Sequence, residues 1–155
     1  MIRHGIAQER ELGIPDAERS LTDKGRDKTH QVAQRLSELA IEFDQIFTSP
    51  LRRAEQTARI LSGQSQITVC AHLAPGGDIR AWLEKMRSQS WALDTRIALV
   101  GHQPDLAQWA EILVWGEARD QIVLKKAGII GLIAPDGLFV GRSQLFWLTP
   151  PKFLL

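Results

Sequence analysis

The chain has 155 residues, of which 44% are hydrophobic and 24% are charged, as in an ordinary globular protein with one core. Its formal net charge of +1 gives no reason to expect a nucleic acid or an anionic membrane as a partner. The single Cys70 cannot form an internal disulfide, and no apolar run is long enough to span a bilayer. We therefore expect a cytoplasmic protein with a single domain over residues 1–155.

The first 70 residues alternate between strand and helix patterns. Met1-Ile2 leaves a very short first strand, whereas a central strand has about five residues, so we expect the natural start to lie upstream. Apolar residues at helical spacing predict a helix over residues 22–40, with Thr22 as its N-cap. Residues 44–48 are typical of a strand. Ser49-Pro50 opens a second predicted helix, and residues 67–70 form the next predicted strand.

The alternation continues into the second half of the chain. Asp78 is a candidate cap for a helix that runs through Met86. Residues 96–100 form a continuous apolar run, typical of a parallel strand covered on both faces, and a helix is expected over residues 104–115. Three further strands are predicted at residues 122–124, 128–133 and 144–148. The pattern predicts a three-layer α/β/α sandwich with a mainly parallel central sheet.

Two histidines fall directly after predicted strands. His4 stands between Arg3 and Gly5, and a glycine lets the backbone turn sharply where a strand ends. His102 follows the strand at residues 96–100. In parallel sheets chemistry is found beyond the carboxyl ends of the strands, so both imidazoles are candidates for one site. Each histidine alone could equally be a surface residue or, for His102, a cap of the next helix.

Two adjacent arginines, Arg52 and Arg53, fall near the start of the second helix. A helix N-terminus carries a partial positive charge, so arginines there are unfavourable unless an anion compensates them. Neighbouring residues lie about 100° apart around a helix, so at most one of the two points into a shared site. The residues alone favour a solvated Arg52, and we expect Glu55 and Gln56 on the helix surface.

Five motifs, in the same order along the chain, carry a resemblance to a known family. They lie at residues 3–7, 19–25, 49–57, 73–78 and 101–102. Together they resemble the histidine phosphatase superfamily, and within it the small SixA-type phosphohistidine phosphatases. The resemblance implies a phosphoglycerate-mutase-like fold, in agreement with the sandwich that the strand and helix pattern predicts.

The resemblance also implies a role for each matched residue. His4 corresponds to the nucleophile, and Arg3 to the phosphate-binding arginine beside it. Arg53 corresponds to the second phosphate-binding arginine, and His102 to the second histidine of the site. Arg19 resembles an additional arginine at the entrance. Because guanidinium groups fork onto phosphoryl oxygens, we expect neither a metal ion nor another cofactor.

A missing carboxylate bears on the substrate. Relatives that cleave phosphate esters place an acid where it can protonate the leaving alkoxide, but no acidic residue precedes the turn at residues 74–78. Asp78 could reach inward, although a helix cap is the simpler reading. A leaving imidazole needs little protonation, so the sequence favours a phosphorylated histidine. By resemblance, its carrier is the histidine phosphotransfer domain of a phosphorelay protein.

The expected reaction passes through a covalent phospho-His4, which water then hydrolyses. Two alternatives remain open. One is a small-molecule phosphomonoesterase of the same superfamily, and the other is a module that binds phosphorylated proteins without turnover. His30 and His72 are expected at the surface or in packing roles.

Overall fold

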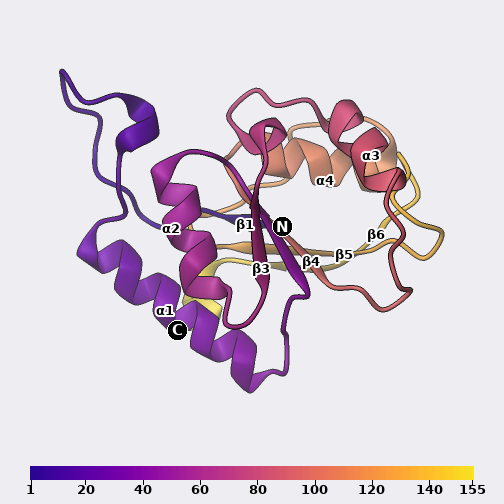
Figure 1. Cartoon of the computed structure of the whole chain (residues 1–155), viewed down its shortest axis with the longest axis horizontal. Coiled ribbons are helices and arrows are strands. Elements are labelled where there is room, and N and C mark those ends of the chain that lie inside the picture. The colour runs from indigo at the N-terminus through magenta and orange to yellow at the C-terminus, as the bar shows by residue number, and fades with distance from the viewer.

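The computed structural model describes residues 1–155, and a six-stranded sheet runs through its centre (Figure 1). The strands are β1 (Ile2–Arg3), β2 (Gln45–Thr48), β3 (Gln66–Val69), β4 (Ile97–Gly101), β5 (Ile129–Ile133) and β6 (Gln144–Thr149). They lie in the order β3-β2-β4-β1-β5-β6. The first four strands are parallel to one another, and β5 is antiparallel to both of its neighbours, β1 and β6. The sheet is therefore mainly parallel, and the carboxyl ends of β2, β4 and β1 meet at one edge.

Four helices cover the two faces of this sheet, and three short 3-10 turns join the elements. The helices are α1 (Asp23–Glu38), α2 (Arg52–Leu61), α3 (Ile79–Arg87) and α4 (Asp105–Trp115). The turns are η1 (Asp16–Glu18), η2 (Ala71–Leu73) and η3 (Pro151–Phe153). In Figure 1, α1 and α2 lie on one side of the strands and α3 and α4 on the other. The predicted three-layer α/β/α sandwich is confirmed, and none of its helices has the length and apolar character needed to cross a membrane.

The alternation of side chains along the strands divides the core into two layers. Successive residues of a strand point to opposite faces, so Ile46 packs with α1 and α2 while Phe47 packs with α3 and α4. Trp82 of α3 and Trp109 of α4 are both buried, and their ring centroids lie 5.6 Å apart. Both tryptophans therefore belong to the core on the α3 and α4 side of the sheet.

Side-chain caps fix the starts of two helices as the sequence predicts. Oγ1 of Thr22 accepts the N–H of Gly25 over 3.0 Å at the start of α1. Oδ1 of Asp78 accepts the N–H of Arg80 over 2.8 Å at the start of α3. The helix expected from Ser49-Pro50 instead begins at Arg52, so the two arginines occupy its first two positions.

One predicted strand is wrong. Residues 122–124 lie in an extended loop with no partner in the sheet. The reason is Glu111, a fully buried residue of α4 whose carboxylate accepts backbone N–H groups from this loop. Those donors belong to Arg119, Asp120, Gln121 and Ile122, at distances of 2.6–2.8 Å. The carboxylate satisfies backbone donors that would otherwise need a neighbouring strand.

The central strand β1 is very short. Ile2 pairs with Val100 of β4 and with Ile129 of β5, and Arg3 pairs with Gly101. Beside Met1, side chains of β4, β5 and neighbouring segments line an apolar cavity of about 1020 Å³. The two paired residues nevertheless place Arg3, and the histidine that follows it, at the carboxyl edge of the sheet.

Candidate active site

His4 follows β1 directly, and its ring is held in one orientation. Nδ1 lies 2.7 Å from the carbonyl oxygen of Gly5, which can only accept, so Nδ1 carries the proton and Nε2 the lone pair. The N–H of Gly5 donates to Oγ1 of Thr57 over 3.0 Å. A Cβ on residue 5 would lie 2.5 Å from Oγ1 of Thr29, so this close turn requires glycine. The backbone thus fixes which nitrogen of the predicted nucleophile is reactive.

Arg53 and His102 reach the His4 ring from two other segments of the chain. Nε of Arg53 donates to Nε2 of His4 over 3.3 Å, and Nη2 of Arg53 lies 3.5 Å from Nδ1 of His102. The two imidazole centroids are 5.1 Å apart. All three residues are buried, with exposed fractions of 4–6%. The structure therefore brings together three of the residues that the sequence predicts for one site.

The turn after β2 supports His102. Oγ of Ser49 lies 2.8 Å from Nε2 of His102 and also accepts the N–H of Leu51 over 3.2 Å. A serine hydroxyl can both donate and accept, so it can pair with either neutral form of the imidazole. The sequence places Ser49 at the start of a helix and within the motif at residues 49–57, but its contact with His102 was not predicted.

Arg3 lies at the same edge of the sheet and is half-buried. Its Nη1 donates to the carbonyl oxygen of Leu124 over 2.9 Å, while its buried Nε has no hydrogen-bond partner. Leu124 lies in the loop whose backbone N–H groups donate to Glu111, so Glu111 supports the position of Arg3 through this loop. An unpaired buried N–H is costly, and an anion bound at Arg3 would satisfy it.

The electrostatic surroundings keep both imidazoles neutral. Burial is the main cause that lowers the pKa of His4 to about 3. The hydrogen bond to Gly5 opposes this shift, while the positive charges of protonated His102, Arg53 and Arg3 lower the pKa of His4 further. Burial, followed by the charge of Arg53, lowers the pKa of His102 to about 4. At neutral pH the lone pair on Nε2 of His4 is therefore available for attack.

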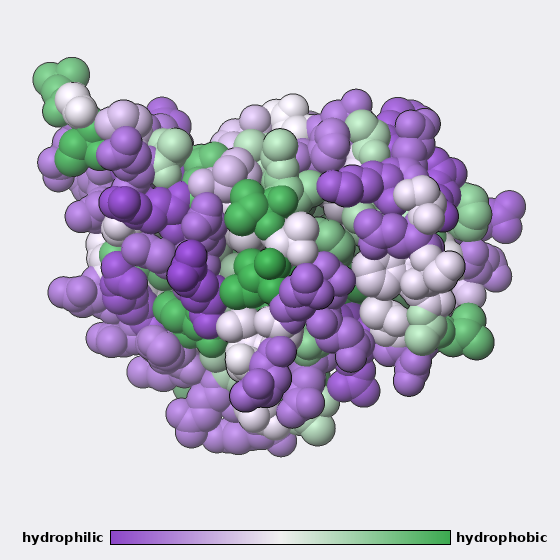
Figure 2. All heavy atoms as spheres, viewed as in Figure 1, coloured by the Kyte–Doolittle hydropathy of each residue, from purple (hydrophilic) through white to green (hydrophobic).

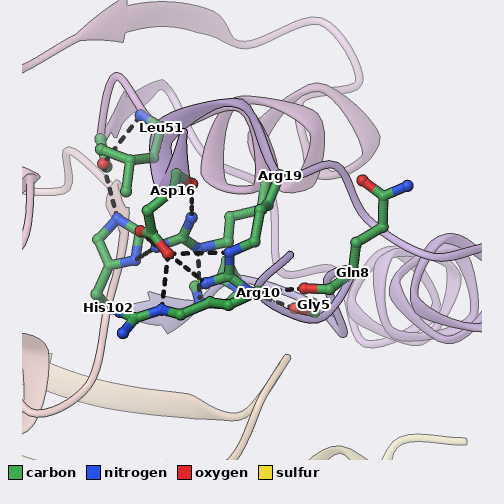
Figure 3. Close-up of polar contacts among 10 residues, drawn as sticks. Gly5, Gln8, Arg10, Asp16, Arg19, Leu51 and His102 are labelled. Atoms are coloured by element: carbon green, nitrogen blue, oxygen red, sulfur yellow. Dashed lines mark hydrogen bonds and ion pairs between the residues drawn. The ribbon is translucent and has the colours of Figure 1, made fainter. Parts of the chain in front are cut away.

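A carboxylate that sequence reasoning missed lies beside these groups. Figure 3 shows Asp16 among Arg10, Arg19 and His102, and its Oδ2 also accepts from Nη2 of Arg53 over 2.9 Å. Arg19, the predicted entrance arginine, pairs with Oδ1 of Asp16 over 2.8 Å instead of contacting either imidazole directly. The only sequence signal for Asp16 is an acidic residue three positions before a candidate arginine.

Other candidate residues lie outside this cluster. Arg52 is exposed, as expected, while its neighbour Arg53 is buried. Asp78 caps α3, which confirms the simpler of the two interpretations of this residue. The expectation that Gln56 is ordinary helix surface is wrong, because its Oε1 accepts the N–H of Leu21 over 2.7 Å and ties α2 to the chain before α1. His30 is exposed.

The groups in this cluster are suited to two kinds of chemistry, nucleophilic attack and the binding of an oxyanion. The neutral imidazole of His4 has a lone pair on Nε2 that can attack an electrophile, and the guanidinium groups of Arg3 and Arg53 are donors suited to an oxyanion with several oxygens. The structure contains no group of three or more histidine, cysteine or acidic side chains that could hold a metal ion.

Comparisons with known proteins identify the family to which this fold and this cluster belong. Residues 1–74 match the family model of the histidine phosphatase superfamily (branch 1). An uncharacterized protein of Picosynechococcus sp. strain PCC 7002 is 44% identical over 158 residues, which cover 99% of this chain and 96% of that protein. The chain belongs to the histidine phosphatase superfamily.

Further comparisons place its fold within this superfamily. The solved structure of the protein histidine phosphatase SixA with tungstate has a TM-score of 0.81 at 24% identity, covering 99% of this chain and 97% of that chain. Phosphoserine phosphatase of Entamoeba histolytica has a TM-score of 0.68 at 18% identity, with coverages of 99% and 97%. The mitochondrial serine/threonine-protein phosphatase Pgam5 of Drosophila ananassae is 33% identical over 84 residues, or 51% of this chain and 28% of that protein. The expected phosphoglycerate-mutase-like fold of SixA type is confirmed.

Proposed function

We propose that the protein is a metal-independent phosphohistidine phosphatase that acts on a phosphorylated histidine of another protein. The observation that carries this proposal is the fixed form of His4, with Nδ1 bound to Gly5 and Nε2 facing Arg53. The likeness to SixA, a protein histidine phosphatase, supports the substrate class. The proposed partner is the histidine phosphotransfer domain of a cytoplasmic phosphorelay protein.

The proposed reaction has two displacements at phosphorus. In the first, Nε2 of His4 attacks, the bond from phosphorus to the substrate imidazole breaks, and the released nitrogen takes a proton from solvent. In the second, water attacks phosphorus, the bond from phosphorus to Nε2 of His4 breaks and returns its electron pair to the ring, and both protons of the water leave in the inorganic phosphate, so the neutral ring with its proton on Nδ1 is regenerated. Charge on the phosphoryl oxygens is balanced by Arg3 and Arg53, with His102 beside them, where other phosphatases use a metal ion.

The placement of nearby carboxylates supports a leaving imidazole over a leaving alkoxide. Oδ1 of Asp78 accepts from the first turn of α3, and Oδ1 of Asp105 accepts the N–H of Gly76 over 2.9 Å. Hydrogen bonds and charge from Arg53 and then Arg19 outweigh burial and lower the pKa of Asp16 to about 2. At neutral pH Asp16 is therefore ionised and has no proton to donate to an alkoxide.

A second candidate is a phosphomonoesterase, which the similarities to a phosphoserine phosphatase and to Pgam5 favour. The two candidates are separated by comparing kcat/KM on a phosphohistidine protein with kcat/KM on phosphoserine and sugar phosphates. We expect the phosphohistidine protein to be preferred by at least about a hundredfold. A preference for an ester would replace the proposal by the second candidate. Phosphoprotein binding without turnover on any substrate would indicate a non-catalytic binding module.

A further inference from the structure

Asp16 binds the outer end of the Arg53 guanidinium twice. Nη1 of Arg53 donates to the backbone carbonyl oxygen of Asp16 over 2.7 Å, and Nη2 donates to Oδ2 over 2.9 Å. The other carboxylate oxygen accepts from Arg19 over 2.8 Å and from Arg10 over 3.1 Å. Phosphoryl oxygens bind arginine through the same forked, charge-assisted contacts. Asp16 therefore uses the donors of Arg53 that a phosphoryl group would use.

Asp16 also lies on the solvent side of the site. Its side chain is 37% exposed, whereas the side chain of Arg53 is 4% exposed and His4 is 6% exposed. A phosphoryl group that comes from solvent must reach Nε2 of His4, which already accepts from Arg53. The phosphoryl group therefore reaches Nε2 of His4 most directly if the contact between Asp16 and Arg53 rearranges.

The segment that carries Asp16, residues 8–20, is attached to the body mainly through this contact. Its base is closed by a bridge between Ala7 and Leu21. Residues 9–18 have only two hydrogen bonds to residues outside the segment 8–20, and both come from Arg53. The segment projects from the body in Figure 1, and in Figure 2 apolar atoms lie at its end. Leu12, in the middle of this segment, is fully exposed.

We propose that Asp16 is a specificity-determining residue, an internal carboxylate that occupies Arg53 in the free protein and yields to a phosphoryl dianion but not to a monoanion. The inference rests on the proposed phosphatase site. A tethered carboxylate has an effective concentration of about millimolar or above, so a free carboxylate of equal charge gains nothing by replacing it. A phosphoryl group carries about two negative charges and three acceptor oxygens, so it can also engage Arg3 and displace Asp16.

Anion binding by the Asp16→Asn variant tests the proposal, because asparagine keeps the shape and one acceptor oxygen while it removes the charge. The matched control is Glu18→Gln, which removes a charge from an exposed residue of the same turn that makes no ion pair. Calorimetry at pH 8 measures the binding of inorganic phosphate and of acetate. We expect Asp16→Asn to bind phosphate about tenfold more tightly than the wild type and to bind acetate measurably. Glu18→Gln should behave as the wild type.

Each other outcome has a definite meaning. Equal or weaker phosphate binding by Asp16→Asn, in a variant that melts as a folded protein, would overturn the proposal and make Asp16 a support for Arg53. The phosphatase assignment would survive that result. If neither protein bound phosphate, the anion site itself would be absent, and the proposed function would fail together with this inference.

Hydrogen exchange of the wild-type protein gives a second test that needs no variant. If phosphate displaces Asp16, the segment at residues 8–20 loses the two hydrogen bonds from Arg53 that attach it to the body, and its backbone amides should exchange faster at saturating phosphate. Unchanged or slower exchange would show that the segment stays in place, which contradicts displacement.

Discussion

The Nε–H of Arg53 donates to Nε2 of His4 over 3.3 Å. This contact requires a lone pair on Nε2. The hydrogen bond from Nδ1–H to the carbonyl oxygen of Gly5 stabilises the tautomer that has this lone pair. One arginine therefore stands beside the reactive nitrogen and disfavours its protonation. The form of the imidazole that attack needs is already set in the free protein.

The ring of His4 should remain neutral, with its proton on Nδ1, throughout the range in which an ordinary histidine becomes charged. Burial is the main reason, because it lowers the pKa of His4 to about 3. The pKa falls on folding, so the neutral form persists as the pH decreases from 8 to about 5. Nitrogen-15 NMR of the imidazole reports both tautomer and charge. An imidazolium, or a proton on Nε2, at pH 6 would contradict this account of the nucleophile.

Replacement of Arg53 should have a far larger effect than replacement of its neighbour. Arg53→Ala removes a buried donor beside the reactive nitrogen, so we expect kcat/KM to fall by about 10³. Arg52→Ala is the matched control, because that side chain is exposed, and it should change kcat/KM less than twofold or so. Steady-state kinetics on a phosphohistidine protein measures both. Equal losses would mean that the wrong arginine has been assigned to the site.

Glu111 should stabilise the fold and thereby the position of Arg3. Glu111→Gln replaces a carboxylate that accepts four backbone N–H groups, so we expect a loss of about 3 kcal/mol in the free energy of unfolding. Urea denaturation measures this loss, and Glu117→Gln, at an exposed position, is the control. A loss below about 1 kcal/mol would show that the loop does not depend on this carboxylate.

The same substitution should show a pH dependence. Backbone hydrogen bonds outweigh burial and lower the pKa of Glu111 in the folded protein. Its stabilising contribution is therefore complete above the unfolded pKa of about 4.3 and is lost as the pH falls through the lower folded value. The difference in unfolding free energy between wild type and Glu111→Gln should shrink at acidic pH. A difference that grew on acidification would contradict the sign of this shift.

Local signals explain why much of the fold and site could be predicted from the sequence. A glycine beside a histidine at a strand end located His4 and His102, and a short hydroxyl or acidic side chain before an apolar pattern located the caps Thr22 and Asp78. The 100° rotation between neighbouring helical residues predicted that at most one of the two adjacent arginines enters the site, and the family resemblance assigned that place to Arg53, which is buried while Arg52 is exposed. These features depend on a few adjacent residues, which the sequence shows directly.

The missed features depend on contacts between distant residues. Asp16 binds Arg53 across 37 positions, within a polar segment that has no periodicity. Glu111 appears in the sequence only as a single carboxylate in an apolar helix, and the donors that it satisfies lie in the loop mistaken for a strand. Gln56 binds Leu21 across 35 positions. No local pattern predicts which polar side chain will satisfy a distant backbone group.

The most direct test of the account is to identify the residue that carries phosphate during turnover. The protein is incubated briefly with a labelled phosphohistidine protein, quenched in alkali and digested, and the labelled peptide is sequenced. The account predicts acid-labile phosphate on Nε2 of His4, because Nδ1 is bound to Gly5, and no label in His4→Ala. Turnover with label on another residue, or with the same label in His4→Ala, would contradict it.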